Sequence, residues 1–264
     1  MDIPKFETRK ELFTWLKTNQ DEIIYQKKSM FKTADCFQAP TFLIGNGGGT
    51  AFKDATSGDA SEVKVRAIIN TTMIRDSHKD VHIDGLWNKS LKENIRIKHL
   101  QEHEMKFDKI IADKTDLKAF TKTYEWKQLG YDIEGKTQAL VFDSIVKEKR
   151  NPVMFKEYKE GNVDNHSVGM YYTNIKMAID SDDEGDEKEK AEFDKHIDNI
   201  ANKAEVKKDG FFFAVYEAKA IEGSAVLLGS NPITPTLSTS KNFGEDDEPE
   251  ADPTVIAIKE WLLK

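Results

Sequence analysis

The sequence predicts an α+β protein in which most strands pair antiparallel. Two observations lead to this prediction: short runs typical of strands recur from about residue 63 to residue 228, and only a few helical patterns separate them. A parallel α/β sheet instead requires a helix between most successive strands. The strand and helix patterns are taken below in chain order.

The clearest strand pattern runs from Val63 to Ile69, where apolar residues alternate with Lys and Arg. A second alternation places Ile95 and Ile97 between polar neighbours. Alternation of this kind is typical of a strand. Further strands are predicted at four short apolar or aromatic runs: Ala139–Phe142, Val168–Tyr172, Phe211–Tyr216 and Ala225–Leu228.

Helical patterns occur at the start of the chain, between the strands and at its end. Thr8 and Glu11 have the spacing of a capping box before a helical apolar pattern, which predicts an N-terminal helix. Two internal helices are predicted at Pro152–Tyr158 and Lys188–Lys203. A short amphipathic helix is predicted at the end of the chain, from the spacing of Val255, Ile258, Trp261 and Leu262.

Composition divides the chain into three parts. Residues 1–60 are predicted to contain the N-terminal helix and a flexible connector around Gly45–Thr50, which lacks the Gly-Lys-Ser/Thr ending of a phosphate loop. Residues 61–233 form the predicted main domain. Residues 234–264 are predicted to be an acidic disordered linker, Thr234–Asp252, followed by the short C-terminal helix.

The charge and cysteine content narrow the function classes. The 264 residues include 47 Asp and Glu against 39 Lys and Arg, a net charge of −8 that disfavours binding to a phosphate backbone. The single cysteine, Cys36, cannot form an intramolecular disulfide and fits a reducing compartment. No apolar run approaches the ~20 residues that span a bilayer. We therefore expect a soluble protein without nucleic-acid or membrane partners and without a cofactor.

Two motifs suggest metal sites, but neither fits well. The run His99-Leu-Gln-Glu102-His103 matches His-x-x-Glu-His, which would bind zinc through both histidines on one helix face, with a distant carboxylate as the third ligand. The residues before it alternate like a strand, so we expect no zinc. The acidic stretch from Asp180 resembles the start of a calcium loop, but its twelfth position is Ala191, so a solvated loop is expected.

A third group of residues could perform nucleophilic catalysis. Ser167 lies in a strand-type run, His103 lies upstream and Glu222 lies downstream. A serine hydroxyl becomes a nucleophile when a histidine removes its proton, and a carboxylate holds that histidine in the required tautomer. Spacing alone leaves open whether the three side chains meet.

Four segments of the chain resemble the prohead proteases of tailed phages, which are similar in fold to the herpesvirus assembly proteases. Arg75-Asp-Ser-His-Lys-Asp-Val-His-Ile-Asp-Gly-Leu-Trp87 resembles an Asp-rich early segment of that family. Ile97-Lys-His-Leu-Gln-Glu-His-Glu104 is similar to the family's apolar run that ends at the catalytic histidine. Ser167-Val-Gly-Met170 resembles the strand that carries the nucleophile, and the segment from Glu222 to Pro232 resembles the one with the acidic residue.

The resemblance implies a serine protease with His103, Ser167 and Glu222 as its catalytic residues. It also implies a mainly antiparallel, β-barrel-like core with surrounding helices, as in the herpesvirus enzymes. The family register favours His103 over His99 as the base. His166 neighbours Ser167 on the same strand and is expected to face away from the site, because successive residues point to opposite faces.

The same resemblance implies that the protein acts in the host cytoplasm, inside the viral procapsid. Its implied substrates are the scaffolding protein, the major capsid protein and the chain itself, with self-cleavage in the segments flanking the core; a homodimer is a further partner to consider. Two alternatives remain open. One is a non-catalytic assembly or scaffold-binding protein that docks through its C-terminal helix. The other is a zinc peptidase.

Overall fold

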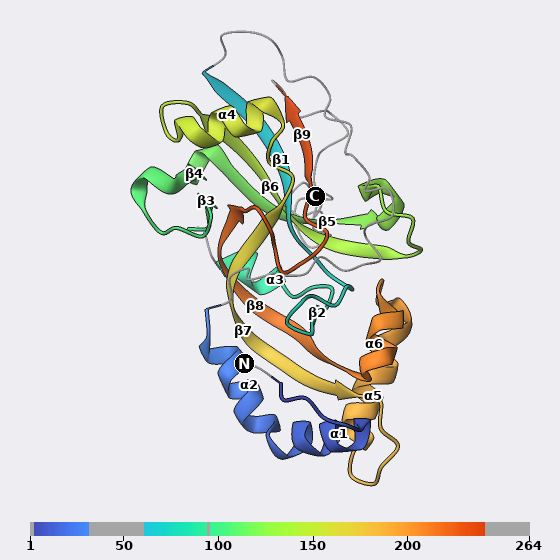
Figure 1. The fold of residues 1–264 in the computed structure, drawn as a ribbon. Coiled ribbons are helices and arrows are strands. Elements are labelled where there is room, and N and C mark those ends of the chain that lie inside the picture. The colour runs from blue at the N-terminus through green and yellow to red at the C-terminus, as the bar shows by residue number, and fades with distance from the viewer. Residues whose placement is uncertain (1–2, 32–60, 94–95, 241–264) are drawn as a thin grey trace, which may run out of the picture.

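The structure is a computed structural model that describes residues 3–31, 61–93 and 96–240 (Figure 1). These residues form a mixed α+β fold, as the sequence predicts. The strands are arranged in two sheets. The first sheet is antiparallel throughout and has the strand order β5-β6-β1-β9. Its strands are β1 (Glu62–Thr71), β5 (Leu117–Glu125), β6 (Lys136–Lys147) and β9 (Thr236–Ser240).

The second sheet is built around one long strand, β8. Strand β7 pairs antiparallel with it along one edge, while β2 and β3 pair parallel with its two ends along the other edge, and β4 joins β3. The strands are β2 (Asp80–His82), β3 (Lys98–Gln101), β4 (Ile110–Asp113), β7 (His166–Ile179) and β8 (Phe211–Ala225). Most pairings are antiparallel, but no closed barrel forms among the described residues.

The N-terminal segment forms two helices, α1 (Arg9–Thr18) and α2 (Gln20–Ser29). The predicted capping box is present: Thr8 Oγ1 accepts a hydrogen bond from the Glu11 amide, and the Glu11 carboxylate accepts one from the Thr8 amide, each at 3.2 Å. Phe13, Leu16 and Ile23 join the main apolar core together with residues of β7 and β8. The N-terminal helices therefore share the core of residues 61–233.

A buried ion pair attaches α2 to the second sheet. Lys27 contacts the Asp80 carboxylate on β2, and both side chains are almost fully buried. The Lys27 ammonium also lies 4.2 Å from the centre of the Phe213 ring on β8. Each partner compensates the burial of the other's charge, which an isolated buried ion would lack.

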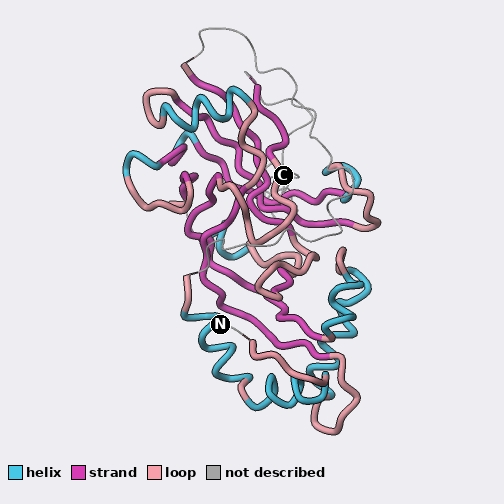
Figure 2. Tube along the Cα trace, in the orientation of Figure 1, coloured by secondary structure: helices cyan, strands magenta, loops and turns pink. Residues whose placement is uncertain are grey.

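The remaining α-helices pack around the strands. They are α3 (Asn88–Glu93), α4 (Pro152–Glu160), α5 (Glu187–His196) and α6 (Lys203–Asp209). Helix α4 confirms the prediction at Pro152–Tyr158. The helix predicted at Lys188–Lys203 ends at His196, where a short 3₁₀ turn, Ile197–Asn199, precedes α6. Figure 2 shows α1 and α5 at the lower end of the long β7–β8 ribbon, with α2 running alongside it.

Three sequence predictions need correction. Strand β3 begins at Lys98, so Arg96 and Ile97 precede it, and residues 94–95 lie outside the described part. The strand predicted at Ala225–Leu228 is wrong because β8 ends at Ala225, where neither β3 nor β7 extends further to supply a partner. Part of the predicted linker, Thr236–Ser240, is instead strand β9, whose backbone pairs with β1 despite its polar composition.

Two further predictions fall outside the described residues: the Gly-rich connector around Gly45–Thr50 and the C-terminal helix after Val255. Among the residues that the structure does describe, no helix has the length and apolar character needed to span a membrane.

Candidate functional site

The three predicted catalytic residues lie on or beside three adjoining strands, β3, β8 and β7. In the β7–β8 ladder, Ser167 pairs with Ser224, and Gly169 pairs with Glu222. Side chains alternate between the faces of a strand, so Ser167, Glu222 and Ser224 lie on one face of the sheet. Side chains directly opposite each other across an antiparallel pair have β-carbons about 5 Å apart.

His103 reaches this face from a tight turn after β3. Both Glu102 and His103 have left-handed backbone conformations, with φ of 52° and 58°. Non-glycine residues seldom adopt this conformation, which is enriched at functional sites and needs support from its surroundings. The support comes from β8: the Glu102 amide donates to the Ala225 carbonyl at 2.9 Å, and the His103 amide donates to Ser224 Oγ at 3.1 Å.

The His103 imidazole contacts the Glu222 carboxylate directly. Nδ1 of His103 lies 2.6 Å from Oε1 of Glu222, whose side chain is completely buried, while 11% of the histidine side chain is exposed. A carboxylate oxygen accepts hydrogen bonds, so His103 donates to Glu222 from Nδ1. The second ring nitrogen, Nε2, is then left as the basic one.

Gly169 makes room for this carboxylate. A β-carbon at position 169 would lie 1.9 Å from Glu222 Oε1 and 2.6 Å from Cζ of Phe31, the residue that follows α2 closely. Such distances are far below van der Waals contact. The glycine in the Ser167-Val-Gly-Met170 segment is therefore required by the position of the acid, and the Phe31 ring packs over the same spot.

The opposite face of the same strands carries a second histidine cluster. His166 and His99 are fully buried there, and the Tyr158 hydroxyl of α4 lies 2.9 Å from His166 Nε2 and 3.1 Å from His99 Nε2. The prediction that His166 faces away from Ser167 is confirmed. His166 Nδ1 lies 2.9 Å from the Thr234 carbonyl, and His99 Nδ1 lies 2.9 Å from Ser144 Oγ.

The Thr234 carbonyl at one end of this cluster determines which atom carries each hydrogen-bonding proton. The Thr234 carbonyl only accepts, so His166 donates from Nδ1 and its Nε2 accepts the Tyr158 proton. Tyr158 has a single proton, so its oxygen accepts from His99 Nε2–H, and His99 Nδ1 accepts from Ser144. Burial lowers the pKa of His166 to about 4 and lowers the pKa of His99 well below its usual value, so both rings are neutral.

The geometry argues against the zinc motif. His99 lies on strand β3 and bonds to Ser144 and Tyr158, whereas His103 lies in the turn and bonds to Glu222. Zinc binding through this motif requires both rings on one face of a helix, and residues 99–103 are not helical. No group of three or more metal-ligating side chains occurs in the described part of the chain.

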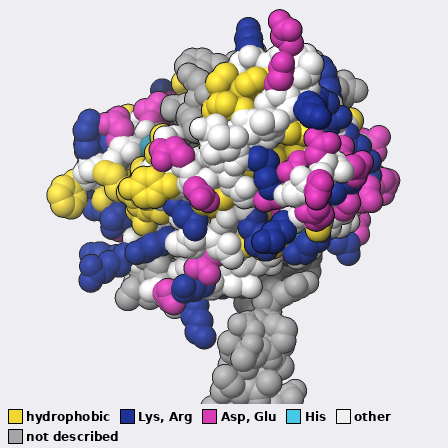
Figure 3. Space-filling view, turned by 90° about the horizontal axis from the view of Figure 1, so that it is seen from below, with side chains coloured by type: hydrophobic (Ala, Val, Ile, Leu, Met, Phe, Trp, Pro, Cys, Tyr) yellow, Lys and Arg dark blue, Asp and Glu magenta, His cyan; other side chains and the backbone are white. Residues whose placement is uncertain are grey.

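The acidic stretch from Asp180 lies in the loop before α5, as the solvated-loop interpretation predicts. Its carboxylates form ion pairs: Asp180 with Arg9 and Lys190, and Asp186 with Lys17. Figure 3 shows acidic side chains gathered on one side of the helical end of the molecule, interspersed with lysine and arginine. The ion pairs of Asp180 and Asp186 connect the loop to α1 and α5.

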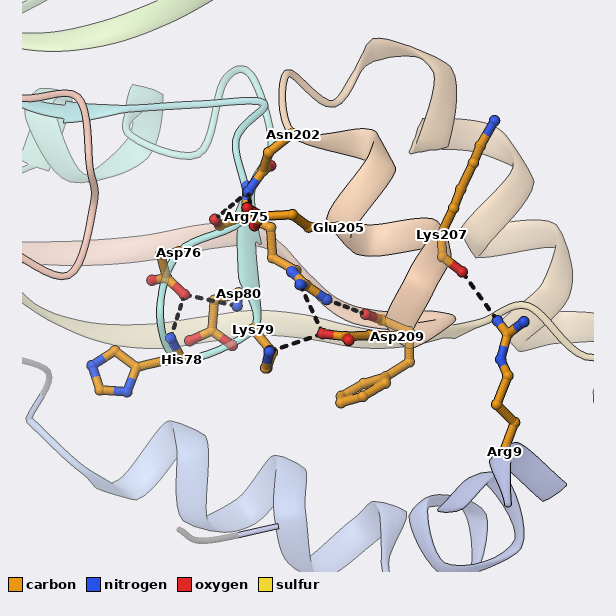
Figure 4. A network of polar contacts seen from close by, with 11 residues as sticks. Arg9, Arg75, Asp76, His78, Lys79, Asp80, Asn202, Glu205, Lys207 and Asp209 are labelled. Atoms are coloured by element: carbon orange, nitrogen blue, oxygen red, sulfur yellow. Dashed lines mark hydrogen bonds and ion pairs between the residues drawn. The ribbon is translucent and has the colours of Figure 1, made fainter. Parts of the chain in front are cut away.

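The Asp-rich segment that begins at Arg75 has a structural role (Figure 4). The Asp76 carboxylate accepts hydrogen bonds from the amides of His78 and Asp80, each at 2.9 Å, and so closes the turn before β2. Arg75 and Lys79 both reach the Asp209 carboxylate at the end of α6, at 2.8 and 2.9 Å. This network attaches the turn to α6, at the end of β8 opposite to His103 and Glu222.

Sequence reasoning missed Ser224 and Tyr158. Ser224 follows Glu222 by two residues, the spacing that places both side chains on one face of a strand, and this signal was available in the sequence. Tyr158 had no such signal, because it approaches the two histidines from helix α4.

No protein-family model, curated protein or solved structure shows a significant match to this chain.

Proposed function

We propose that the protein is a serine endopeptidase in which Ser167 is the nucleophile, His103 the general base and Glu222 the residue that orients the base. The observation that carries the proposal is the 2.6 Å contact between His103 Nδ1 and the buried Glu222, on the face of the sheet that also carries Ser167. A buried carboxylate behind an imidazole, beside a serine, is the arrangement that activates a hydroxyl.

The proposed reaction proceeds in two stages. Nε2 of His103 takes the proton of Ser167, whose oxygen attacks the scissile carbonyl, and the imidazolium then gives that proton to the departing amine. A water molecule, deprotonated by the same nitrogen, hydrolyses the acyl-enzyme and restores Ser167. Glu222 stays ionised throughout, holds the Nδ1 proton and stabilises the imidazolium.

Exposed apolar side chains near the site favour a polypeptide substrate. Four of the eight large hydrophobic side chains that are exposed in the described residues lie on the two loops that follow β3 and β8: Met105, Phe107, Leu227 and Leu228. The two loops start side by side, because Gln101 pairs with Ala225. Exposed apolar side chains on two loops that start together can contact a bound polypeptide.

The resemblance to the prohead proteases supplies the biological setting of the proposal. On this basis the core is a variant of the herpesvirus-protease fold, and the substrates are scaffolding protein, capsid protein and the chain itself, cleaved inside the procapsid during phage assembly. The alternative of a non-catalytic assembly protein rests on the helix predicted after Val255, in a part of the chain outside the described residues.

The proposal is tested by co-expressing the chain with the scaffolding and capsid proteins and identifying truncation products by mass spectrometry. We expect wild type to cleave, and we expect Ser167→Ala to lose at least ~10³-fold in rate. The matched control is Ser144→Ala, which removes a buried serine hydroxyl from the other face of the same region and should leave cleavage intact.

A serine-directed fluorophosphonate gives an independent measurement. It should label wild type on the peptide that contains Ser167 and fail to label Ser167→Ala. Equal cleavage by wild type and Ser167→Ala would exclude this nucleophile, and loss of cleavage on chelation would indicate a metal peptidase. The absence of both cleavage and labelling would favour the assembly-protein alternative.

A further inference from the structure

Ser224 lies at the centre of the candidate site without being one of its three proposed catalytic residues. Its side chain is fully buried on β8, directly across the ladder from Ser167. Its Oγ lies 2.5 Å from Glu222 Oε2 and 3.1 Å from the backbone nitrogen of His103. The hydroxyl therefore contacts both the acid and the backbone of the residue that carries the base.

The direction of both hydrogen bonds follows from the groups involved. An ionised carboxylate can only accept and a backbone amide can only donate. The single hydroxyl proton of Ser224 therefore goes to Glu222, and an oxygen lone pair accepts the His103 amide. This proton assignment also makes Ser224 a poor candidate for the nucleophile, since its proton already points to the acid and its side chain is inaccessible.

Each oxygen of Glu222 has its own partner as a result. Oε2 accepts from Ser224, and Oε1 accepts from His103 Nδ1. Without the Ser224 donor, the carboxylate could rotate and its oxygens could exchange partners. At the same time the left-handed His103 turn would lose the acceptor of its amide. The Ser224 hydroxyl thus fixes the positions of both Glu222 and His103.

We propose that Ser224 is a positioning residue that keeps His103 in the Nδ1-protonated tautomer, an inference that rests on the proposed function of the site. Its effect on the reaction passes through His103 and Glu222. In the correct tautomer, Nε2 is unprotonated and available to Ser167. In the other tautomer, Nε2 carries the proton and cannot act as a base.

The decisive measurement is nitrogen NMR of isotopically labelled histidine rings in the full chain, because the nitrogen shifts report which ring atom carries the proton. With the ring neutral, we expect wild-type His103 to be protonated at Nδ1 alone. Ser224→Ala should give a mixture of tautomers. Ser224→Cys, which is similar in shape but a weak donor, should shift the population in the same direction and serves if the alanine variant does not fold.

The matched control is Ser144→Ala, which removes a hydroxyl from the His99 cluster on the other face and should leave the His103 tautomer unchanged. In cleavage assays, Ser224→Ala should lower kcat roughly 10- to 100-fold with little change in KM, while Ser144→Ala should keep wild-type kcat. In wild type, the fluorophosphonate should label the Ser167 peptide and leave Ser224 unlabelled. In Ser224→Ala, it should still label the Ser167 peptide.

The outcomes separate the inference from the proposed function. An unchanged His103 tautomer in both Ser224 variants overturns the positioning role, even if the protein is a protease. A tautomer shift in a protein that cleaves nothing supports the positioning role and removes the proposed function. Labelling of Ser224 by the fluorophosphonate overturns both assignments of the two serines.

Discussion

The two faces of the sheet formed by β3, β8 and β7 each carry a histidine cluster, and the two clusters differ in charge and in access. On one face, His103 is partly exposed and contacts an ionisable acid, Glu222. On the other, His99 and His166 are fully buried and bond only to neutral groups. Adjacent residues of one strand, His166 and Ser167, contribute to opposite clusters.

The comparison shows how partners decide what a histidine can do. A ring held between neutral hydrogen-bond partners in a buried site stays neutral and supports the fold. A ring that donates from Nδ1 to a buried carboxylate presents Nε2 as its acceptor nitrogen. The difference arises from the strand alternation, which places Glu222 and Ser224 on one face and Gly223 and Ala225 on the other.

The largest effect is expected from Glu222→Gln, which replaces the acid that distinguishes the His103 cluster from the His99 and His166 cluster. The amide can hold the imidazole in the wrong tautomer, so kcat for cleavage should fall roughly 10³- to 10⁴-fold while the fold is kept. Steady-state kinetics on a cleaved peptide would measure this loss.

The matched control for that variant is Glu192→Gln, which alters another close contact between a glutamate and a histidine, His196 Nε2 to Glu192 Oε1 at 3.3 Å. It should retain wild-type kcat. A Glu222→Gln enzyme that keeps more than about a tenth of the activity would mean that the carboxylate does not serve the reaction.

The next effect is expected from Gly169→Ala, which crowds only the face that carries Ser167 and Glu222. The new methyl group would overlap Glu222 Oε1 and must displace the carboxylate, so we expect roughly a 100-fold fall in kcat. Gly185→Ala is the control, because the added β-carbon meets no neighbour within 4 Å. Its backbone φ of 93° disfavours a side chain. It should cost stability, measured by urea unfolding, and spare activity.

The smallest effect is a loss of stability at low pH, caused by the buried histidines on the other face of the sheet. Because the pKa of His166 is lowered to about 4 in the folded protein, the unfolded chain binds more protons between about pH 6.5 and pH 4. The contribution of His166 to the free energy of unfolding is therefore fully present above about pH 6.5. It is lost as the pH falls, by about 2 kcal/mol at pH 5. His99 acts in the same direction.

Urea unfolding at about pH 7.5 and pH 5 measures this loss. His166→Gln cannot titrate and should show a flatter dependence on pH, although its stability at neutral pH should be lower because Tyr158 loses its acceptor. An equal dependence in wild type and His166→Gln would assign the acid sensitivity to other groups.

Local patterns predicted much of the fold because the forces behind them are local. The Thr8 capping box, the alternating residues of β1 and the proline start of α4 all form as predicted, since capping and face alternation act within a few residues. The errors at Ala225–Leu228 and Thr236–Ser240 have the opposite origin. A strand exists only where another backbone pairs with it, and no local pattern contains the partner.

The residue types of the site and their spacing are visible in the sequence: a histidine after a short strand pattern, a serine and a glycine two residues apart, and a glutamate and a serine two residues apart. The pairing of Ser167 with Ser224 and the contact of His103 with Glu222 are visible only in the folded chain. These contacts join residues more than 50 positions apart, and they depend on the register of β7 and β3 against β8. That register is set by the packing of the whole sheet.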